Sequence, residues 1–344
     1  MLIKIAYVEL TVGNIVQSSF YFEQALGFTR VGYAGLETGE KRAVSVLMRQ
    51  NDIFLILSSG LNDESKVSQH VSQHGDSIKH IAFISHHPES EYARINELGV
   101  PCIDDEFGRK SFCIFGETMH SFLQDLNELE RRFSVSLSDQ ITGAGFLLEK
   151  IDHIAICVNT GSIERYIPFY LNAFDFQITH TEQVDTGKGG MDSKVLQNQS
   201  KSIKLVFVEP LAKYKTSQLS EFIRYYRGEG VQHLAYATSD IRISASKIRA
   251  KGVSFLKVPK SYYEERLQSL PDLSNTINLC SDLDILVDRD EDGNLYQTFS
   301  HPIQTKPTCF FELVERLGNQ GFGSDNIKAL FRAIEREQVK RGTL

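Results

Sequence analysis

Two histidines and one glutamate in three separate strand-like segments are the residues of this sequence best suited to hold a metal ion. His153 lies in the segment DHIAICV, His233 in QHLAYA and Glu312 in FFELV. Because side chains alternate across a strand, each histidine shares its face with small residues, while large aliphatic residues point to the other face. His233 follows His153 by 80 residues, and Glu312 follows His233 by 79. This regular spacing predicts that the three lie in equivalent strands of one curved sheet.

The chemistry of these residues favours a metal over a purely structural role. A carboxylate in an apolar strand is costly to bury, and a cation removes that cost. Two neutral imidazoles and one carboxylate on one face leave three coordination positions open, which suits non-haem Fe(II) and reactions of dioxygen. Each histidine alone is more often a hydrogen-bonded core residue, and Glu312 could instead pair with Arg289 or Arg316. The combination of all three favours the metal site.

The strands that carry these residues belong to a module that occurs twice. In each copy, helical and strand periods alternate as β-α-β-β-β, so we expect an α+β fold of two tandem βαβββ modules. The matching segments are 4–31 and 150–178, 74–85 and 228–239, and 116–124 and 293–301.

The modules define two expected domains, an N-terminal domain over 1–140 and a C-terminal domain over 150–344. Ser and Gly residues at 133–149 mark the boundary between them. Other expected elements are helices over 89–98 and 241–250, an irregular insert over 260–282, and a C-terminal helix over 324–341 with Ser324 as its N-cap.

The first module lacks the donor set of the second. Tyr7 stands at the first ligand position and His80 at the second, and no acid is evident at the third. One histidine does not make a metal site, so we expect the N-terminal domain to be without metal.

Composition excludes several classes of protein. The 344 residues are 41% hydrophobic and 24% charged, with a net charge of −7 and no basic tract, which argues against nucleic-acid binding. The apolar runs are strand-sized, and the start of the chain resembles no secretory signal, so we expect neither a membrane span nor export. Five scattered cysteines argue against a disulfide framework and fit a reducing cytoplasm.

Several long segments resemble one enzyme family. The layout is similar to the vicinal-oxygen-chelate fold, and the C-terminal half resembles the branch of 4-hydroxyphenylpyruvate dioxygenases and 4-hydroxymandelate synthases. The resemblance implies an open barrel around the metal, closed by the C-terminal helix as a lid. It rests on DHIAICVN (152–159), GEGVQHLAYATSDI (228–241), KGVSFLKVPKSYYEERL (251–267), ILVDRDEDGNLYQTFSHP (285–302) and PTCFFELVERLGNQGFGSDNIKALFRAIEREQ (307–338).

The resemblance also implies a site and its ligands. His153, His233 and Glu312 match the family's iron ligands, with O2 as co-substrate and an arylpyruvate as the small-molecule substrate. Because that substrate carries its own 2-oxo acid, no separate 2-oxoglutarate is expected. Relatives suggest a homo-oligomer, with a dimer favoured. The residues that match the family's substrate cavity are Ser193, Val208, Gln218, Gln232, Gln297, Phe299, Phe310, Phe322 and Ile327.

Two positions bear on the product. Val208 stands where homogentisate-forming relatives usually carry Asn, and Ile327 stands where they usually carry a lid Phe. Both aliphatic residues resemble the mandelate-forming synthases, whereas Phe331 falls where such a synthase is expected to have Tyr. We therefore expect 4-hydroxymandelate and CO2 as products.

Other functions stay open. Homogentisate formation in tyrosine breakdown is the nearest alternative, followed by the same chemistry on phenylpyruvate or another 2-oxo acid. No residue is assigned to bind the para-hydroxyl group of the substrate, because Gln218 is expected in a loop. An extradiol catechol dioxygenase would use a similar ligand set, and a ligand-binding or resistance protein could be built from the same modules. Inactivity on catechols would argue against the extradiol dioxygenase, and absence of bound iron after anaerobic reconstitution would favour the ligand-binding protein.

Overall fold

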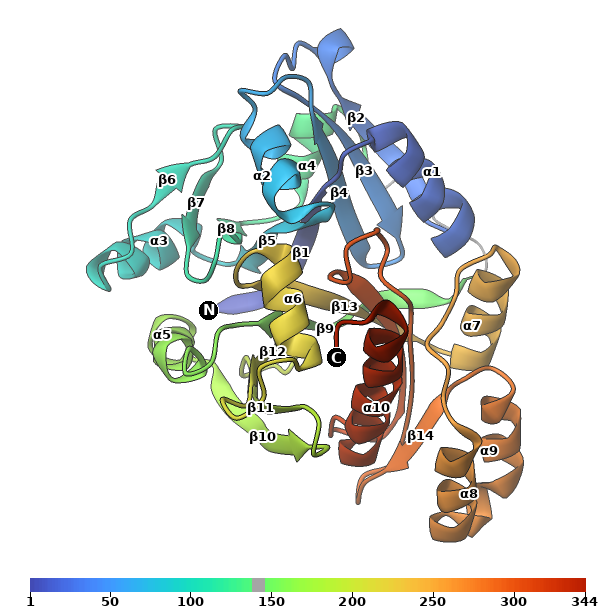
Figure 1. Ribbon diagram of the computed structural model, residues 1–344. Helices are drawn as coiled ribbons and strands as arrows, with labels where there is room; N and C mark the ends of the chain where they lie inside the picture. Colours follow the sequence, from blue (N-terminus) through green and yellow to red (C-terminus); the bar gives the residue numbers. More distant parts are fainter. Residues whose placement is uncertain (138–145) are drawn as a thin grey trace.

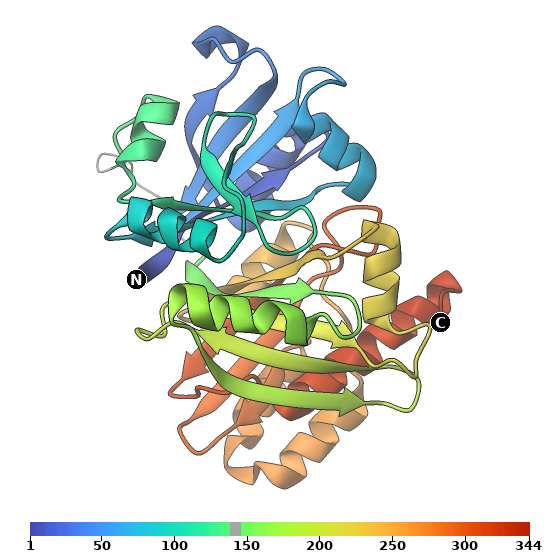
Figure 2. The same cartoon turned by 90° about the vertical axis from the view of Figure 1, so that its left-hand side faces the viewer.

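The computed structural model describes residues 1–137 and 146–344, which form two mixed eight-stranded sheets (Figure 1). The strand orders are β2-β3-β4-β1-β5-β8-β7-β6 and β10-β11-β12-β9-β13-β16-β15-β14. Adding eight to each strand number of the first sheet gives the strand order of the second. The two halves therefore have the same topology, and the α+β fold of tandem βαβββ modules is confirmed. Figure 2 shows the half that begins the chain stacked on the half that ends it.

In the first half, local sequence signals mark both ends of α1. Asn14 caps α1 by accepting a hydrogen bond from the backbone NH of Gln17, and Gly27 ends it with φ of 76°, a conformation that glycine adopts without strain. Its elements are β1 (Leu2–Thr11), α1 (Ile15–Leu26), β2 (Thr29–Ala34), the 3-10 turn η1 (Leu36–Thr38), β3 (Ala43–Gln50), β4 (Ile53–Gly60), α2 (Lys66–His74), β5 (Ser77–Ser85), α3 (Pro88–Glu97), β6 (Ile103–Asp104), β7 (Lys110–Cys113), β8 (Met119–Leu123) and α4 (Asn127–Phe133).

The second half repeats this plan and adds helices. Asp240 caps α7 through two backbone NH groups, in the manner of Asn14. Its elements are β9 (Leu148–Cys157), α5 (Ile163–Phe174), β10 (Gln177–Asp185), β11 (Gly190–Gln197), β12 (Lys204–Pro210), α6 (Gln218–Tyr226), β13 (Gly230–Thr238), α7 (Ile241–Ala250), α8 (Lys260–Ser269), the 3-10 turn η2 (Pro271–Leu273), α9 (Ser274–Ser281), β14 (Leu286–Arg289), β15 (Asn294–Phe299), β16 (Phe310–Leu317) and α10 (Ser324–Arg341).

Two local expectations are corrected, and a third falls partly outside the described residues. The insert over 260–282 is helical, because it forms α8 and α9. Its apolar residues do not recur on one face, so helical periodicity could not reveal it. Ser324 is the first residue of α10 rather than its N-cap, which is Gly323. Part of the expected domain boundary, 138–145, lies outside the described residues.

The third pair of matching segments is also corrected. β8 pairs in parallel with β5, and β16 pairs in parallel with β13. The segment 116–124 therefore corresponds to the strand that carries Glu312, not to 293–301, which contributes β15.

One apolar core continues from the first half into the second. The Tyr170 hydroxyl lies 2.8 Å from Nε2 of His120, and the rings of Phe28 and Tyr236 lie 6.0 Å apart edge to face. These contacts fix the two sheets relative to each other. None of the helices in the described part of the chain is long and apolar enough to cross a membrane.

Candidate metal centre

Three side chains from adjacent central strands of the second sheet converge. His153 lies on β9, His233 on β13 and Glu312 on β16. Oε2 of Glu312 lies 3.2 Å from Nε2 of His153 and 3.3 Å from Nε2 of His233, and the three donor atoms lie within 4.8 Å of one another. Ala235 is opposite both His153 and Glu312 in the strand register, so its small side chain leaves room between them. All three are buried.

Two β-bulges orient the histidines. Asp152 is the extra residue of β9 and Gln232 is the extra residue of β13 in their antiparallel pairing. A bulge changes the direction of the inserted side chain. The side chains of Asp152 and Gln232 therefore lie beside the histidines that follow them in the sequence. Oδ1 of Asp152 lies 2.9 Å from Nδ1 of His153, and Oε1 of Gln232 lies 3.3 Å from Nδ1 of His233. With Nδ1 turned to an acceptor, each ring presents Nε2 to Glu312.

Asp152 is itself held by cations. Arg316 donates to both of its carboxylate oxygens at 2.9 Å, and Lys204 lies 3.5 Å away. Burial opposes ionisation, but the hydrogen bond from His153 and the charge of Arg316 hold the pKa of Asp152 well below its usual range. The carboxylate behind His153 is therefore ionised, which strengthens the donor character of the imidazole.

Glu312 is positioned by a chain of amides. Nε2 of Gln297 donates to Oε1 of Glu312 at 2.8 Å, and Nδ2 of Asn326 donates to Oε1 of Gln297 at 2.8 Å. Asn326 lies in the first turn of α10 and accepts from the Tyr262 hydroxyl at 2.6 Å. This chain connects the C-terminal helix to Glu312 and leaves Oε2 facing the two histidines. Despite burial, the histidines lower the pKa of Glu312 to about 2.

The arginine pairing considered for Glu312 is wrong. Arg316 pairs with Asp152, and Arg289 pairs with Asp272. Two imidazole nitrogens and one carboxylate oxygen meet instead, each backed by a second hydrogen-bonding group. This donor set fits an Fe(II)-type cation with open coordination positions.

The equivalent place in the first sheet is arranged differently. Tyr7 and His80 occupy the positions of His153 and His233, and Ser121 takes the place of Glu312. Nε2 of His80 lies 2.7 Å from Oγ of Ser121, and the Tyr7 hydroxyl accepts from Arg109 at 2.9 Å. A serine and a tyrosine held by arginine replace two of the three donors.

Aromatic side chains surround the candidate centre. The ring of Phe310 stacks on His233 at 4.7 Å, and Phe299 meets the same imidazole edge to face at 6.3 Å. Phe322 lies 5.2 Å from the ring of His153. All three are buried, so the histidines stand among apolar rings that restrict water.

The two product-related residues share one apolar cluster. Val208 is buried in it with Phe331, and Ile327 of α10 packs against it. Val208 pairs with Cys157 on β9, which lies on the same face as His153. Ser193 is the partner of Val208 on β11, but its hydroxyl donates to the backbone carbonyl of Glu182 at 3.0 Å.

Three of the amide and aromatic residues singled out from the sequence line one cleft. Gln218, Gln232 and Phe310 contribute to a cleft beside the C-terminal helix. Gln218 is the first residue of α6 rather than a loop residue, and its buried Oε1 has no hydrogen-bond partner among the described residues. Gln297 differs, because both its polar atoms are engaged by Glu312 and Asn326.

Three residues of the centre were not anticipated from the sequence. Asp152 adjoins a candidate ligand, but strand alternation alone places it on the opposite face. Arg316 was considered only as a partner of Glu312, and Asn326, which the fold buries, carries no local signal beyond a polar side chain. Their roles depend on bulges and on contacts between distant segments.

The two eight-stranded sheets and the clustered donors define a vicinal-oxygen-chelate protein with one candidate metal centre of the His-His-Glu type in its second half. Residues 150–298 match the Glyoxalase/Bleomycin resistance protein/Dioxygenase superfamily.

Known proteins with similar sequences and structures show to which family of this class the chain belongs. A 4-hydroxyphenylpyruvate dioxygenase from Dictyostelium discoideum is 33% identical over 98% of this chain and 99% of its own length. Another from Caenorhabditis briggsae is 33% identical over 100% of this chain and 94% of its own length. A solved mutant of 4-hydroxymandelate synthase from Streptomyces coelicolor superposes with a TM-score of 0.89 at 30% identity, covering 98% of this chain and 100% of that one. The chain belongs to the family of 4-hydroxyphenylpyruvate dioxygenases and 4-hydroxymandelate synthases.

Proposed function

We propose that this protein is an Fe(II)-dependent dioxygenase that converts 4-hydroxyphenylpyruvate and O2 into 4-hydroxymandelate and CO2. The substrate supplies its own 2-oxo acid, so no 2-oxoglutarate is consumed. One oxygen atom enters the benzylic carbon and the other enters the new carboxylate, while the original carboxylate leaves as CO2. Family membership supports the reaction class, and the apolar side chains of Val208 and Ile327 in one cluster support the product.

His153, His233 and Glu312 are the proposed iron ligands. Fe(II), when bound, supplies the Lewis acidity and electron transfer that oxygen activation requires. The protein fixes the donors, because Asp152 and Gln232 turn the imidazoles and Gln297 holds the carboxylate.

The neighbouring rings control what reaches the iron. Phe299, Phe310 and Phe322 surround the two histidines with buried apolar surface. A site of this kind binds an aryl side chain and excludes water, which protects reactive intermediates from side reactions. Gln218 has the one unpartnered amide oxygen in the adjoining cleft among the described residues that line it, and we assign it to a polar group of the substrate.

The position of the ring decides the product. Hydroxylation at the benzylic carbon gives 4-hydroxymandelate, whereas attack at ring C1 followed by side-chain migration gives homogentisate. Reacting atoms must approach within about 3–3.5 Å, so a small displacement of the ring changes the outcome. Val208 and Ile327 offer only apolar surface, so no amide or second ring draws the substrate towards the ring-attack position.

The deciding experiment is anaerobic loading with Fe(II), followed by ring-tetradeuterated 4-hydroxyphenylpyruvate and oxygen. The two products have the same formula and cannot be separated by mass when unlabelled. Hydroxymandelate keeps all ring deuterons, whereas migration of the side chain removes one. A product that has lost one deuteron, with the retention time of homogentisate, refutes the proposed product.

Homogentisate formation is the second candidate function. Its support is the similarity to relatives named 4-hydroxyphenylpyruvate dioxygenase, which are 31–33% identical over nearly the whole chain. The same experiment distinguishes the two candidates. Product from phenylpyruvate at a comparable rate would instead extend the substrate class.

A further inference from the structure

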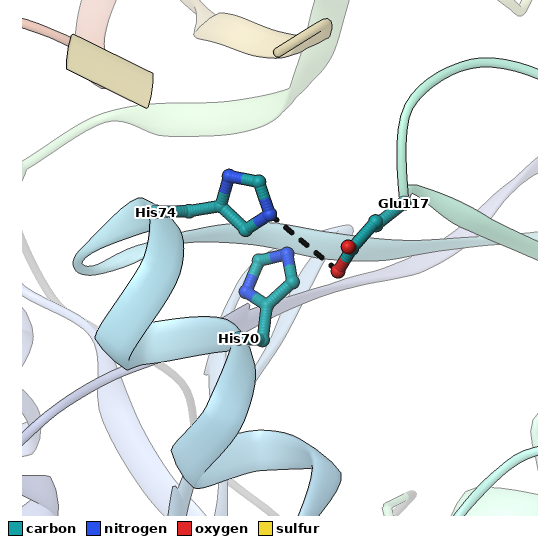
Figure 3. Close-up of side chains that lie close together, drawn as sticks. All are labelled: His70, His74 and Glu117. Atoms are coloured by element: carbon teal, nitrogen blue, oxygen red, sulfur yellow. Dashed lines mark ion pairs between the residues drawn. The ribbon is translucent and has the colours of Figure 1, made fainter. Parts of the chain in front are cut away.

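A second group of metal-type ligands lies in the first half of the chain, away from the candidate iron centre. His70 and His74 stand one turn apart on α2, and Glu117 lies in the turn before β8 (Figure 3). The ligand atoms of these three side chains lie within 4.8 Å of one another. Nε2 of His74 is 3.5 Å from Oε2 of Glu117.

Hydrogen bonds fix the tautomer of both imidazoles. Nδ1 of His74 lies 2.6 Å from the backbone carbonyl of Tyr226. Because a carbonyl only accepts, Nδ1 carries the hydrogen and Nε2 carries a lone pair. Oγ1 of Thr11 lies 3.3 Å from the carbonyl of Ser77, to which it donates, so it accepts from Nδ1 of His70 at 2.9 Å. Nε2 of His70 therefore also carries a lone pair.

Both lone pairs are buried without a partner. His70 and His74 are each 2% exposed, and neither Nε2 has a hydrogen-bond partner among the described residues. A buried polar atom left unsatisfied costs about 1–3 kcal/mol, and here two such atoms lie side by side with a carboxylate. A proton between His74 and Glu117 satisfies that pair but leaves His70 unsatisfied. A cation satisfies all three.

We propose that His70, His74 and Glu117 bind a divalent transition-metal ion of the zinc type. Imidazole nitrogen suits zinc, and two histidines four residues apart on a helix present both rings to one point. Ligands about 2.0–2.1 Å from a tetrahedral zinc lie roughly 3.3 Å apart, close to the distance from His74 to Glu117. The expectation of a metal-free N-terminal domain considered only the position of Tyr7 and His80, which is a different place.

The surroundings fit a cation that enters from solvent. The side chain of Glu117 is 48% exposed, so a cation can reach this ligand from solvent. Lys79 is the neighbouring cation. Burial lowers the pKa of its ammonium group, while the charges of Glu117, Glu9 and Glu106 oppose that shift.

The position indicates a structural role for the metal. Tyr226, which accepts from His74, is the last residue of α6 in the other half. The end of α2 is also joined to the other half by hydrogen bonds from Gln304 to the carbonyl of Asp76 and from Lys306 to the carbonyl of Gln73. A metal on α2 would therefore hold α6, whose first residue is Gln218, against the first half.

The test is zinc stoichiometry of the metal-stripped full chain, measured by calorimetry and by elemental analysis after gel filtration. The candidate iron centre also binds zinc in such an assay, so Glu312→Ala is the background that removes it. We expect about one tight zinc per chain in Glu312→Ala and none after adding His74→Asn. Asparagine keeps a donor for the Tyr226 carbonyl while removing Nε2.

Two further variants distinguish loss of a zinc ligand from a failure to fold. Glu117→Gln changes a half-exposed side chain and should weaken zinc binding by at least about 100-fold in the same background, since even outer-shell changes cost 10–100-fold. His86→Asn removes an exposed imidazole outside the cluster and should leave zinc binding unchanged.

Two readouts locate and evaluate the bound ion. Anomalous scattering at the zinc edge should place a peak between the Nε2 atoms of His70 and His74, and zinc should raise the melting temperature of Glu312→Ala but not of its Glu117→Gln derivative. The proposal is overturned if Glu312→Ala binds no zinc, or if it binds zinc equally well with and without His74→Asn. Neither outcome bears on the proposed dioxygenase reaction.

Discussion

Arg316 and Asp152 form a two-point ion pair directly behind the imidazole of His153. Nε and Nη2 of the guanidinium each donate at 2.9 Å to one carboxylate oxygen, and Asp152 in turn accepts from Nδ1 of His153. Asp152 is buried and the Arg316 side chain is only 13% exposed, so the carboxylate has a fixed place and the imidazole has a fixed tautomer. Iron affinity should therefore depend on a residue that does not touch the metal.

Asp152→Asn tests this dependence. The amide keeps an acceptor for His153 but loses the charge that pairs with Arg316, so we expect the dissociation constant for Fe(II) to rise by about 10–100-fold. Anaerobic titration of Fe(II) measures it, with Asp63→Asn on the exposed surface as the control. An unchanged iron affinity would show that the carboxylate serves only folding.

Alanine at any of His153, His233 or Glu312 should remove bound iron and lower turnover by at least about a thousandfold, because the metal carries the chemistry. Circular dichroism should show a folded chain. His80→Ala is the matched control from the first sheet and should leave the iron content unchanged. If His80→Ala strips the metal, the centre has been assigned to the wrong sheet.

Val208→Asn combined with Ile327→Phe should shift product from 4-hydroxymandelate towards homogentisate. An amide and a second ring replace apolar surface in the cluster beside the centre, and about 1.4 kcal/mol between the two transition states changes the ratio tenfold. Chromatography with the ring-deuterated substrate measures the ratio. Val339→Asn with Ile243→Phe makes the same exchanges at exposed positions and should not alter it.

Stability should fall in acid because of His120. Burial lowers the pKa of His120 to about 4, below the unfolded value near 6.5, so the unfolded chain binds the extra proton first as the pH falls. Between pH 6.5 and 4 this group removes up to about 3 kcal/mol from the free energy of unfolding.

Urea unfolding at several pH values measures that loss. His120→Gln does not titrate but offers an oxygen to the Tyr170 hydroxyl, which lies 2.8 Å from Nε2 in the native protein. The variant should lose less stability between pH 6.5 and 4 than the native chain. Equal losses would assign the acid sensitivity to other groups.

The sequence by itself predicted the repeated module and the set of three candidate metal ligands. Both can be found from the order of residues alone: strand alternation places His153 and His233 among small residues, and the regular spacing places Glu312 in the matching strand. The C-terminal helix was equally readable, because its apolar residues recur at helical spacing. The helices within 260–282 could not be predicted from the sequence, because their apolar residues do not gather on one helical face.

The tertiary structure alone decided how the ligands are held and what else the fold assembles. Alternation places Asp152 and Gln232 on the face opposite their histidines, and bulges, which depend on pairing with another strand, bring them back. Arg316 reaches Asp152 across 164 residues of chain, and Glu117 meets His74 from a separate turn. Such contacts depend on where distant segments pack, and no local pattern encodes that.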